Sequence, residues 1–213
     1  VFVADFNADG QLDIAVTYFS DTKIDVYSRD NLGVFYTLTS IPVAVQTNFL
    51  TGGDFDNDGD IDLFATNNSG VSNVLFNSGL GTFVVGPNIG ANVPNEMLFP
   101  VDINSDGNLD IVYHNGNVEA LINNGSGSFN SATLIANGFS FVSMAVGNFD
   151  NDPRPDIFTN DNTNFQVYRN NGSFSFTPLP ASASAGYYGA TAPQSIGDFD
   201  NDGDLDLLAL RFN

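Results

Sequence analysis

The sequence lacks cysteine and tryptophan, and lysine and arginine together supply only five of its 213 residues. Without cysteine, no disulfide crosslinks the fold and no thiol chemistry is available. The few scattered cations form no basic run, so nucleic acid is not an expected partner. Polar residues interrupt every apolar run well before the roughly 18 residues that a spanning helix needs, so we expect no membrane insertion.

Helix-favouring Glu, Lys, Arg and Met are also scarce, whereas Phe, Val, Asn, Asp, Gly and Ser are abundant. This composition favours strands and turns and predicts an all-β fold. The formal net charge is −20, and the acids behind it are unevenly placed. Five nine-residue stretches, called here the first to fifth acidic loops, hold 19 of the 25 acids and begin at Asp5, Asp54, Asp102, Asn148 and Asp198.

The acidic loops recur with a period near 48 residues, and each has similar surroundings. One apolar run enters the loop, a second leaves it, and two more strand-like runs follow. Four antiparallel strands in a repeat of about 40–50 residues predict the blade of a β-propeller. We expect a single propeller region over residues 1–213, or a fragment of one, with blades at about 1–47, 48–95, 96–140 and 141–192 and a partial blade at 193–213.

A second repeated pattern lies in the turn between the third and fourth strands of each repeat. Asn and Gly suit positive φ in a tight turn, and we expect a Phe to begin the outer strand. The pattern is Asn31, Gly33, Phe35; Asn77, Gly81, Phe83; Asn123, Gly127, Phe129; and Asn170, Gly172, Phe174.

The last repeat supplies only its first two strands, so we expect about four and a half blades, with an unpaired edge at Leu205 to Leu210. Three arrangements stay open: the chain is cut from a larger ring, another chain completes it, or five blades close with a thin fifth. The start at Val1, without an initiator Met, favours a processed or excised segment.

The acidic loops have the spacing of a site for a hard, oxygen-seeking cation, and calcium is the expected ion. Side-chain oxygens are expected from positions one, three, five and nine, and a backbone carbonyl from position seven. The predicted ligands are Asp5, Asn7, Asp9, Gln11, Asp13, Asp54, Asp56, Asp58, Asp60, Asp62, Asp102, Asn104, Asp106, Asn108, Asp110, Asn148, Asp150, Asp152, Arg154, Asp156, Asp198, Asp200, Asp202, Asp204 and Asp206.

The fourth loop departs from this pattern, because Asn148 replaces the leading acid, Pro153 replaces the glycine and Arg154 stands at the seventh position. We therefore expect four calcium sites, and a fifth that is weak or vestigial with Arg154 neutralising part of the charge. An EF-hand is excluded because its twelfth position is a bidentate Glu. The twelfth positions here are Val16, Ala65, Tyr113, Thr159 and Ala209.

The run Asp-Phe-Asp-Asn-Asp-Gly-Asp-Ile-Asp-Leu from Asp54, with the later Phe-Asn-Ser-Gly-Leu-Gly-Thr-Phe, resembles the FG-GAP/VCBS repeat over essentially the whole chain. The resemblance implies a propeller like that of integrin α-subunits, with calcium between the first two strands of a blade. It also implies an extracellular recognition scaffold, since related propellers include fungal lectins, bacterial surface proteins and accessory domains of polysaccharide-degrading enzymes. The expected role of calcium is structural.

Other candidates lie away from the acidic loops. His114 is the only histidine, and we interpret it as a turn residue because no nucleophile or acid pattern accompanies it. Sequons begin at Asn67, Asn124 and Asn171 and are glycosylation sites only if the source secretes through a eukaryotic pathway. Strand alternation places the turns between second and third strands, and the links between blades, together on the opposite face. The links 88–96 and 181–191, the latter with Tyr187 and Tyr188, are candidates for binding.

These observations predict a calcium-stabilised extracellular binding or adhesion module that recognises a glycan or a protein. One alternative is a structural, self-assembling surface protein whose incomplete propeller is completed by a second chain. Another is a non-catalytic part of a polysaccharide-degrading enzyme. We do not expect an enzyme, since no acid/base constellation is visible in the sequence.

Overall fold

The computed structural model contains only β-strands as regular elements in the part of the chain that it describes. The all-β class predicted from the composition is therefore confirmed. No helix among these residues has the length and apolar character needed to cross a bilayer. The described residues are 1–18, 21–30, 32–67, 69–90, 93, 97–137, 143–150, 152–160, 165–179, 195–203 and 205–208.

The strands form four antiparallel sheets of four strands and one of two strands. In each large sheet the strands are hydrogen-bonded in chain order, as expected for successive hairpins. The bounds are β1 Phe2–Ala4, β2 Asp13–Thr17, β3 Lys23–Arg29, β4 Phe35–Pro42, β5 Phe49–Gly53, β6 Asp62–Thr66, β7 Ser72–Asn77, β8 Phe83–Val85, β9 Leu98–Val101, β10 Asp110–His114, β11 Val118–Leu121, β12 Thr133–Ala136, β13 Ser143–Gly147, β14 Asp156–Asn160, β15 Phe165–Asn170, β16 Phe176–Pro178, β17 Ser195–Gly197 and β18 Asp206–Leu208.

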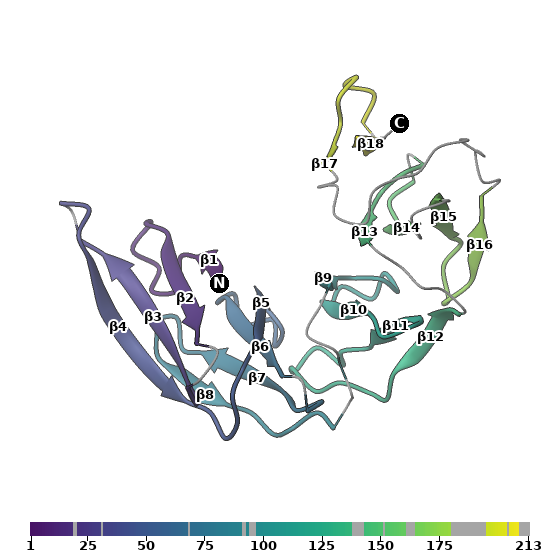
Figure 1. Cartoon of the computed structure of the whole chain (residues 1–213). Helices are drawn as coiled ribbons and strands as arrows, with labels where there is room; N and C mark the ends of the chain where they lie inside the picture. Colours follow the sequence, from purple (N-terminus) through teal and green to yellow (C-terminus); the bar gives the residue numbers. More distant parts are fainter. Residues whose placement is uncertain are drawn as a thin grey trace, which may run out of the picture.

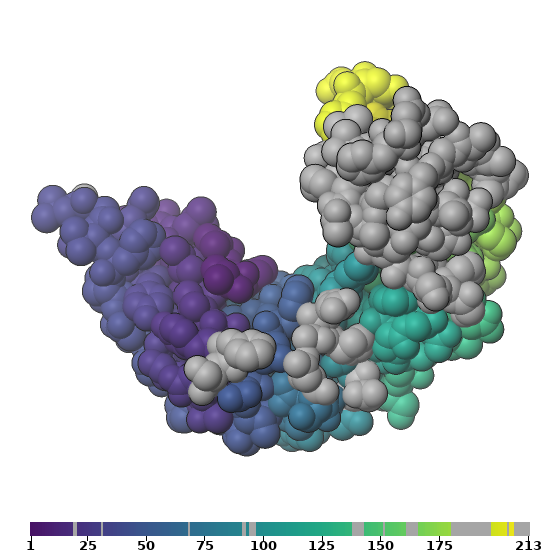
Figure 2. Space-filling view, viewed as in Figure 1, coloured from purple at the N-terminus to yellow at the C-terminus, as the bar shows by residue number. Residues whose placement is uncertain are grey.

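The sheets follow one another around an open arc, with the first strand of each sheet on the concave side and the fourth on the convex side (Figure 1). The first strands of neighbouring sheets contact one another, as β1 with β5, β5 with β9 and β9 with β13. Figure 2 shows the sheets in chain order along the same arc as a continuous packed surface. This radial stacking of four-stranded sheets is a β-propeller architecture, and each sheet is one blade.

Each junction between neighbouring blades is filled by apolar side chains from both blades. The second strand of blade 2 is buried on both faces, since Leu63 packs toward blade 1 and Phe64 toward blade 3, and both side chains are fully buried. Burying a side chain of this size contributes about 1.5–3 kcal/mol. The apolar runs that predicted strands therefore serve to hold the blades together as well.

A buried asparagine at the end of the third strand also joins each blade to the one before it. Asn123 Nδ2 donates to the carbonyl of Leu109 in its own blade at 3.1 Å and to that of Phe55 in blade 2 at 2.7 Å. Asn77 makes the same pair of bonds to Ile61 and Phe6, and Asn170 to Pro155 and Ile103. The repeated Asn, predicted as a turn residue, therefore also links neighbouring blades through its side-chain hydrogen bonds. It is called here the clasp asparagine.

The prediction that a Phe begins the outer strand is right in blade 1, where β4 begins at Phe35, and in blade 2, where β8 begins at Phe83. It is wrong in blade 3, where Phe129 forms only an isolated bridge with Asn123 and β12 begins at Thr133. It is also wrong in blade 4, where β16 begins at Phe176. Phe174 lies in the turn with φ 54–57° together with Ser173, so the chain needs two more residues before the strand starts.

In blade 1, Phe35 pairs with Arg29 at the end of the third strand. Asn31 lies outside the described residues. The last unit consists of β17 and β18 within the described part, and residues 209–210 of its predicted second strand lie outside it.

We predict that Asn123→Ala lowers the free energy of unfolding by about 2–4 kcal/mol, because it removes two hydrogen bonds, one within blade 3 and one to blade 2. The carbonyl of Phe55 keeps the N–H of Gly127 as a donor, whereas that of Leu109 loses its side-chain donor. Urea denaturation would measure the loss. Asn124→Ala is the matched control, since Asn124 is exposed and bonds only within its own turn, to Ser126. If both substitutions lowered the free energy of unfolding equally, the role of Asn123 in linking blades 2 and 3 would be contradicted.

Candidate functional site

The acidic loops join the first and second strands at one end of each blade, called here the loop face. In the first, second, third and fifth loops, two positions adopt left-handed backbone. The fourth has φ of 57–64° in Ala8, Asn57, Ser105 and Asn201, and the sixth has φ of 80–100° in Gly10, Gly59, Gly107 and Gly203. Glycine at the sixth position is therefore required by the backbone, whether or not an ion is bound.

The leading carboxylate organises the turn of the loop. Asp54 accepts the backbone N–H groups of Asp58 and Gly59 at 3.1 and 3.0 Å. The first, third and fifth loops repeat this pair of bonds through Asp5, Asp102 and Asp198. The carboxylate at position one is thus partly satisfied by the loop itself, and its remaining lone pairs are available to a cation.

The carboxylate at position nine is buried beneath the loop. Asp62 accepts the N–H of Phe55 at 3.0 Å and that of Asn77 at 2.8 Å. Burial raises the pKa of Asp62 to about 6, although these two hydrogen bonds act in the opposite direction. Asp110 has the same environment, and burial raises its pKa to about 6 as well. The loop spacing predicts these acids as ligands, but not their second role as caps of the third strand.

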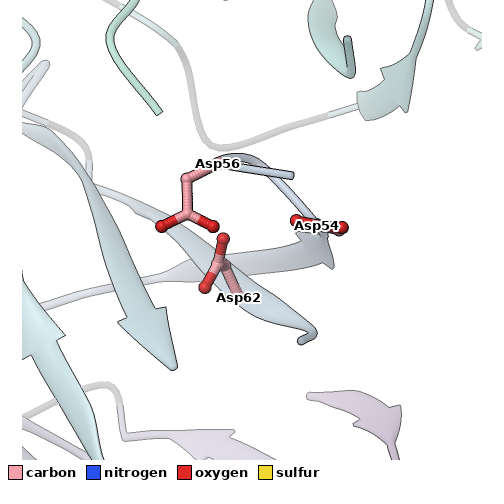
Figure 3. Close-up of side chains that lie close together, drawn as sticks. All are labelled: Asp54, Asp56 and Asp62. Atoms are coloured by element: carbon pink, nitrogen blue, oxygen red, sulfur yellow. The ribbon is translucent and has the colours of Figure 1, made fainter. Parts of the chain in front are cut away.

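The second loop gathers three carboxylates around one point. One oxygen from each of Asp54, Asp56 and Asp62 lies within 4.8 Å of the other two. Figure 3 shows Asp56 and Asp62 facing one another, with Asp54 beside them. Asp56 Oδ1 is buried without a hydrogen-bond partner. Oxygens on opposite sides of a calcium ion lie about 5 Å apart, so the group fits this ion.

The fifth loop forms a similar group from Asp198, Asp200 and Asp206, while Asp204 lies outside the described residues. Among the described residues, the first and third loops do not form a group of three carboxylates, since position three is Asn7 or Asn104. Asp58, at position five, accepts the N–H of Asp60 at 2.9 Å. The corresponding acids Asp9 and Asp106 accept the N–H groups of Gln11 and Asn108.

The fourth loop compensates its charge with two arginines. Arg154 contacts Asp152 and donates to the carbonyl of Asn170 at 2.7 Å. Arg169, from β15, contacts Asp150 and lies 3.6 Å from Asp152. Pro153 cannot adopt the positive φ of the glycines it replaces, and it has no N–H to donate to Asn148. The loop sequence contains Arg154 but does not reveal Arg169, because only the folded sheet brings Arg169 of β15 to Asp150.

The opposite end of the blades, called here the link face, holds the turns between second and third strands and the links between blades. A pocket of about 310 Å³ lies between the link at Val45 and Gln46 and the turn at Asn67 and Ser69. A second, of about 300 Å³, lies beside the next link and is lined in part by Ile89 and Glu119. Successive blade junctions thus carry pockets where the sequence predicted a binding face.

The other predicted candidates have local roles or lie outside the described residues. His114 accepts the N–H of Gly116 at 3.3 Å inside its turn. Asn67 is only 5% exposed and accepts two backbone N–H groups, which makes it a poor glycan acceptor, whereas Asn124 and Asn171 are exposed. Tyr187 and Tyr188 lie outside the described residues.

Comparison with known proteins agrees with the repeat and the fold. A family model described as an FG-GAP-like repeat matches residues 5–65, 54–113, 102–159 and 148–209. A solved structure of an Agrocybe aegerita lectin, described as recognising non-reducing terminal N-acetylglucosamine, is similar with a TM-score of 0.72 at 20% identity. The alignment covers 97% of this chain and 59% of that one, so the chain spans little more than half of the lectin's length. No curated protein sequence matches the chain.

Proposed function

Because the chain belongs to the family of FG-GAP-like repeat proteins, we propose that it is a calcium-stabilised extracellular binding module that recognises a glycan. The observation that carries the proposal is the pair of pockets at successive blade junctions, away from the acidic loops. Their volumes of about 300 Å³ suit a small ligand. The likeness to a lectin makes N-acetylglucosamine the first sugar to test.

The proposed calcium has a structural role. The acidic loops hold most of the chain's acids, and the second loop leaves a buried carboxylate oxygen without a partner. Sites with dissociation constants of about 0.1–1 mM would fill at the millimolar calcium found outside cells. Each would then stabilise the fold by on the order of 1 kcal/mol, and several together by a few kcal/mol.

We predict that a chelator lowers the melting temperature by several degrees relative to the protein in 2 mM calcium, measured by scanning calorimetry. Asp56→Asn should reduce this calcium-dependent shift, because it removes a charge from the group of three carboxylates. Asp21→Asn is the matched control, since Asp21 is an exposed acid outside the loops. Identical melting with and without calcium would refute the structural role.

Glycan binding is tested with an array of neutral and acidic glycans in calcium-containing buffer. We expect binding to a subset that ends in a neutral sugar, because the chain carries a net charge of −20. Chelation should weaken this binding only as far as it unfolds the protein, since the pockets lie away from the acidic loops. An array on which no glycan binds the folded, calcium-loaded protein would count against the proposal.

A second candidate function is assembly, in which another chain completes the propeller. Its support is the face of blade 1 that points away from blade 2. Ile14 and Tyr27 hold the positions that Leu63 and Leu75 hold in blade 2, but they are only partly buried. Val3 and Phe35, on the same face, are each 48% exposed, so the face lacks the cover that blades 2 to 4 receive.

For this candidate we predict concentration-dependent association in sedimentation velocity, weakened by Phe35→Asp. Leu80→Asp is the control, because Leu80 is 74% exposed in a turn of blade 2. A strict monomer at all concentrations would eliminate assembly.

A further inference from the structure

The pocket between blades 2 and 3 combines a link residue with the third strand of the next blade. Ile89, from the link after β8, lines the pocket. Tyr113 and Glu119, which are paired across β10 and β11, also line it, together with Phe129. The pocket of about 300 Å³ is at the small end of the range for ligand sites, which is roughly 300–1,000 Å³. This size suits one sugar residue.

Glu119 retains unused acceptor capacity in this pocket. Its Oε2 accepts hydrogen bonds from the Tyr113 hydroxyl at 2.7 Å and from Asn115 Nδ2 at 3.0 Å. Its Oε1 receives only a long bond of 3.5 Å from Asn117. A carboxylate accepts about four hydrogen bonds, so a ligand O–H or N–H can still bind Oε1.

In the other blades, the side chain at the position of Glu119 already forms a hydrogen bond or an ion pair with another group of the protein. Sheet register aligns Glu119 with Asp25, Asn73 and Gln166. Asn73 donates to the carbonyl of Gly86 at 2.9 Å, and Gln166 donates to that of Leu179 at 2.6 Å. Asp25 forms an ion pair with Lys23 at 2.7 Å. Glu119 has no ion pair among the described residues, so blade 3 alone of these blades offers an uncompensated acceptor here.

Apolar side chains line the same pocket. Phe129 is held by edge contacts with Phe55 and Phe64, at centroid distances of 6.0 and 5.7 Å. Ile89 lines the pocket together with Phe129. A pocket that combines a carboxylate acceptor with apolar side chains matches a pyranose, which has hydroxyl groups at its edge and C–H groups on its faces.

We propose that this pocket binds one terminal neutral sugar residue, with Glu119 accepting a hydrogen bond from a hydroxyl or acetamido N–H group. The inference rests on the proposed glycan-binding function and assigns it a site. Acidic sugars are disfavoured because their carboxylate would meet the charge of Glu119 and the net charge of −20.

The test compares Glu119→Gln with the wild type by calorimetric titration of N-acetylglucosamine, galactose and mannose, with N-acetylneuraminic acid as the acidic probe. We expect at least tenfold weaker binding of the preferred neutral sugar, because a hydrogen bond to a charged acceptor is lost. The melting temperature should stay nearly unchanged, since the new amide oxygen still accepts from Tyr113. Asp21→Asn removes an equal charge outside the pocket and should leave binding intact.

A second variant, Ala132→Trp, fills the pocket without touching Glu119. Ala132 is exposed at the rim, so the fold should persist while sugar binding is lost. If the wild type binds a neutral sugar and both variants bind it equally well, this site is wrong and glycan binding stands. Preferred binding of N-acetylneuraminic acid would also overturn the site. If the wild type binds no sugar in titration or on the array, both the proposed glycan-binding function and this site are wrong.

Discussion

The buried aspartate at the ninth position of the acidic loops is the interaction on which the array depends. In blade 2, Asp62 caps the second residue of its own loop and the N–H of Asn77 at the end of the third strand. Asn77 in turn donates to the carbonyl of Phe6 in blade 1. One carboxylate therefore connects a loop, a strand end and, through the asparagine, the neighbouring blade. Burial raises the pKa of Asp62 to about 6, although its hydrogen bonds with Asn77 and Phe55 act in the opposite direction.

The two ends of the blades therefore tolerate changes of sequence to different degrees. At the loop face, spacing and glycine positions are constrained by hydrogen bonds that recur in nearly every repeat. At the third-strand position of Glu119, by contrast, the chain carries Asp25, Asn73, Glu119 and Gln166 in successive blades. Since the blades differ there without losing their packing, this is where a repeat can acquire a binding site.

The departures from the repeat show which parts of the framework can be replaced. In the fourth loop, Arg154 and Arg169 bring positive charge to Asp150 and Asp152 from within the protein. The first blade has Arg29 where later blades have the clasp asparagine, and Asp13 Oδ1 is left without a hydrogen-bond partner.

The sequence by itself determined the all-β class, the repeat, the number of four-stranded blades and the position of the acidic loops. These features are local and recur with one period, so each copy supports the assignment of the others. The ligand set of the loops was also predicted from spacing, and the structure adds the grouping of Asp54, Asp56 and Asp62.

Only the tertiary structure decided how the repeats are joined and where a ligand fits. The clasp pairs Asn123 with Phe55 across 68 residues, and the pocket brings Ile89 beside Glu119. The shift from Phe174 to Phe176 and the pairing of Arg169 with Asp150 likewise depend on turn geometry and sheet register. Such contacts join residues from different strands and blades, and the local sequence pattern does not specify them because many pairings satisfy the same alternation of apolar and polar residues.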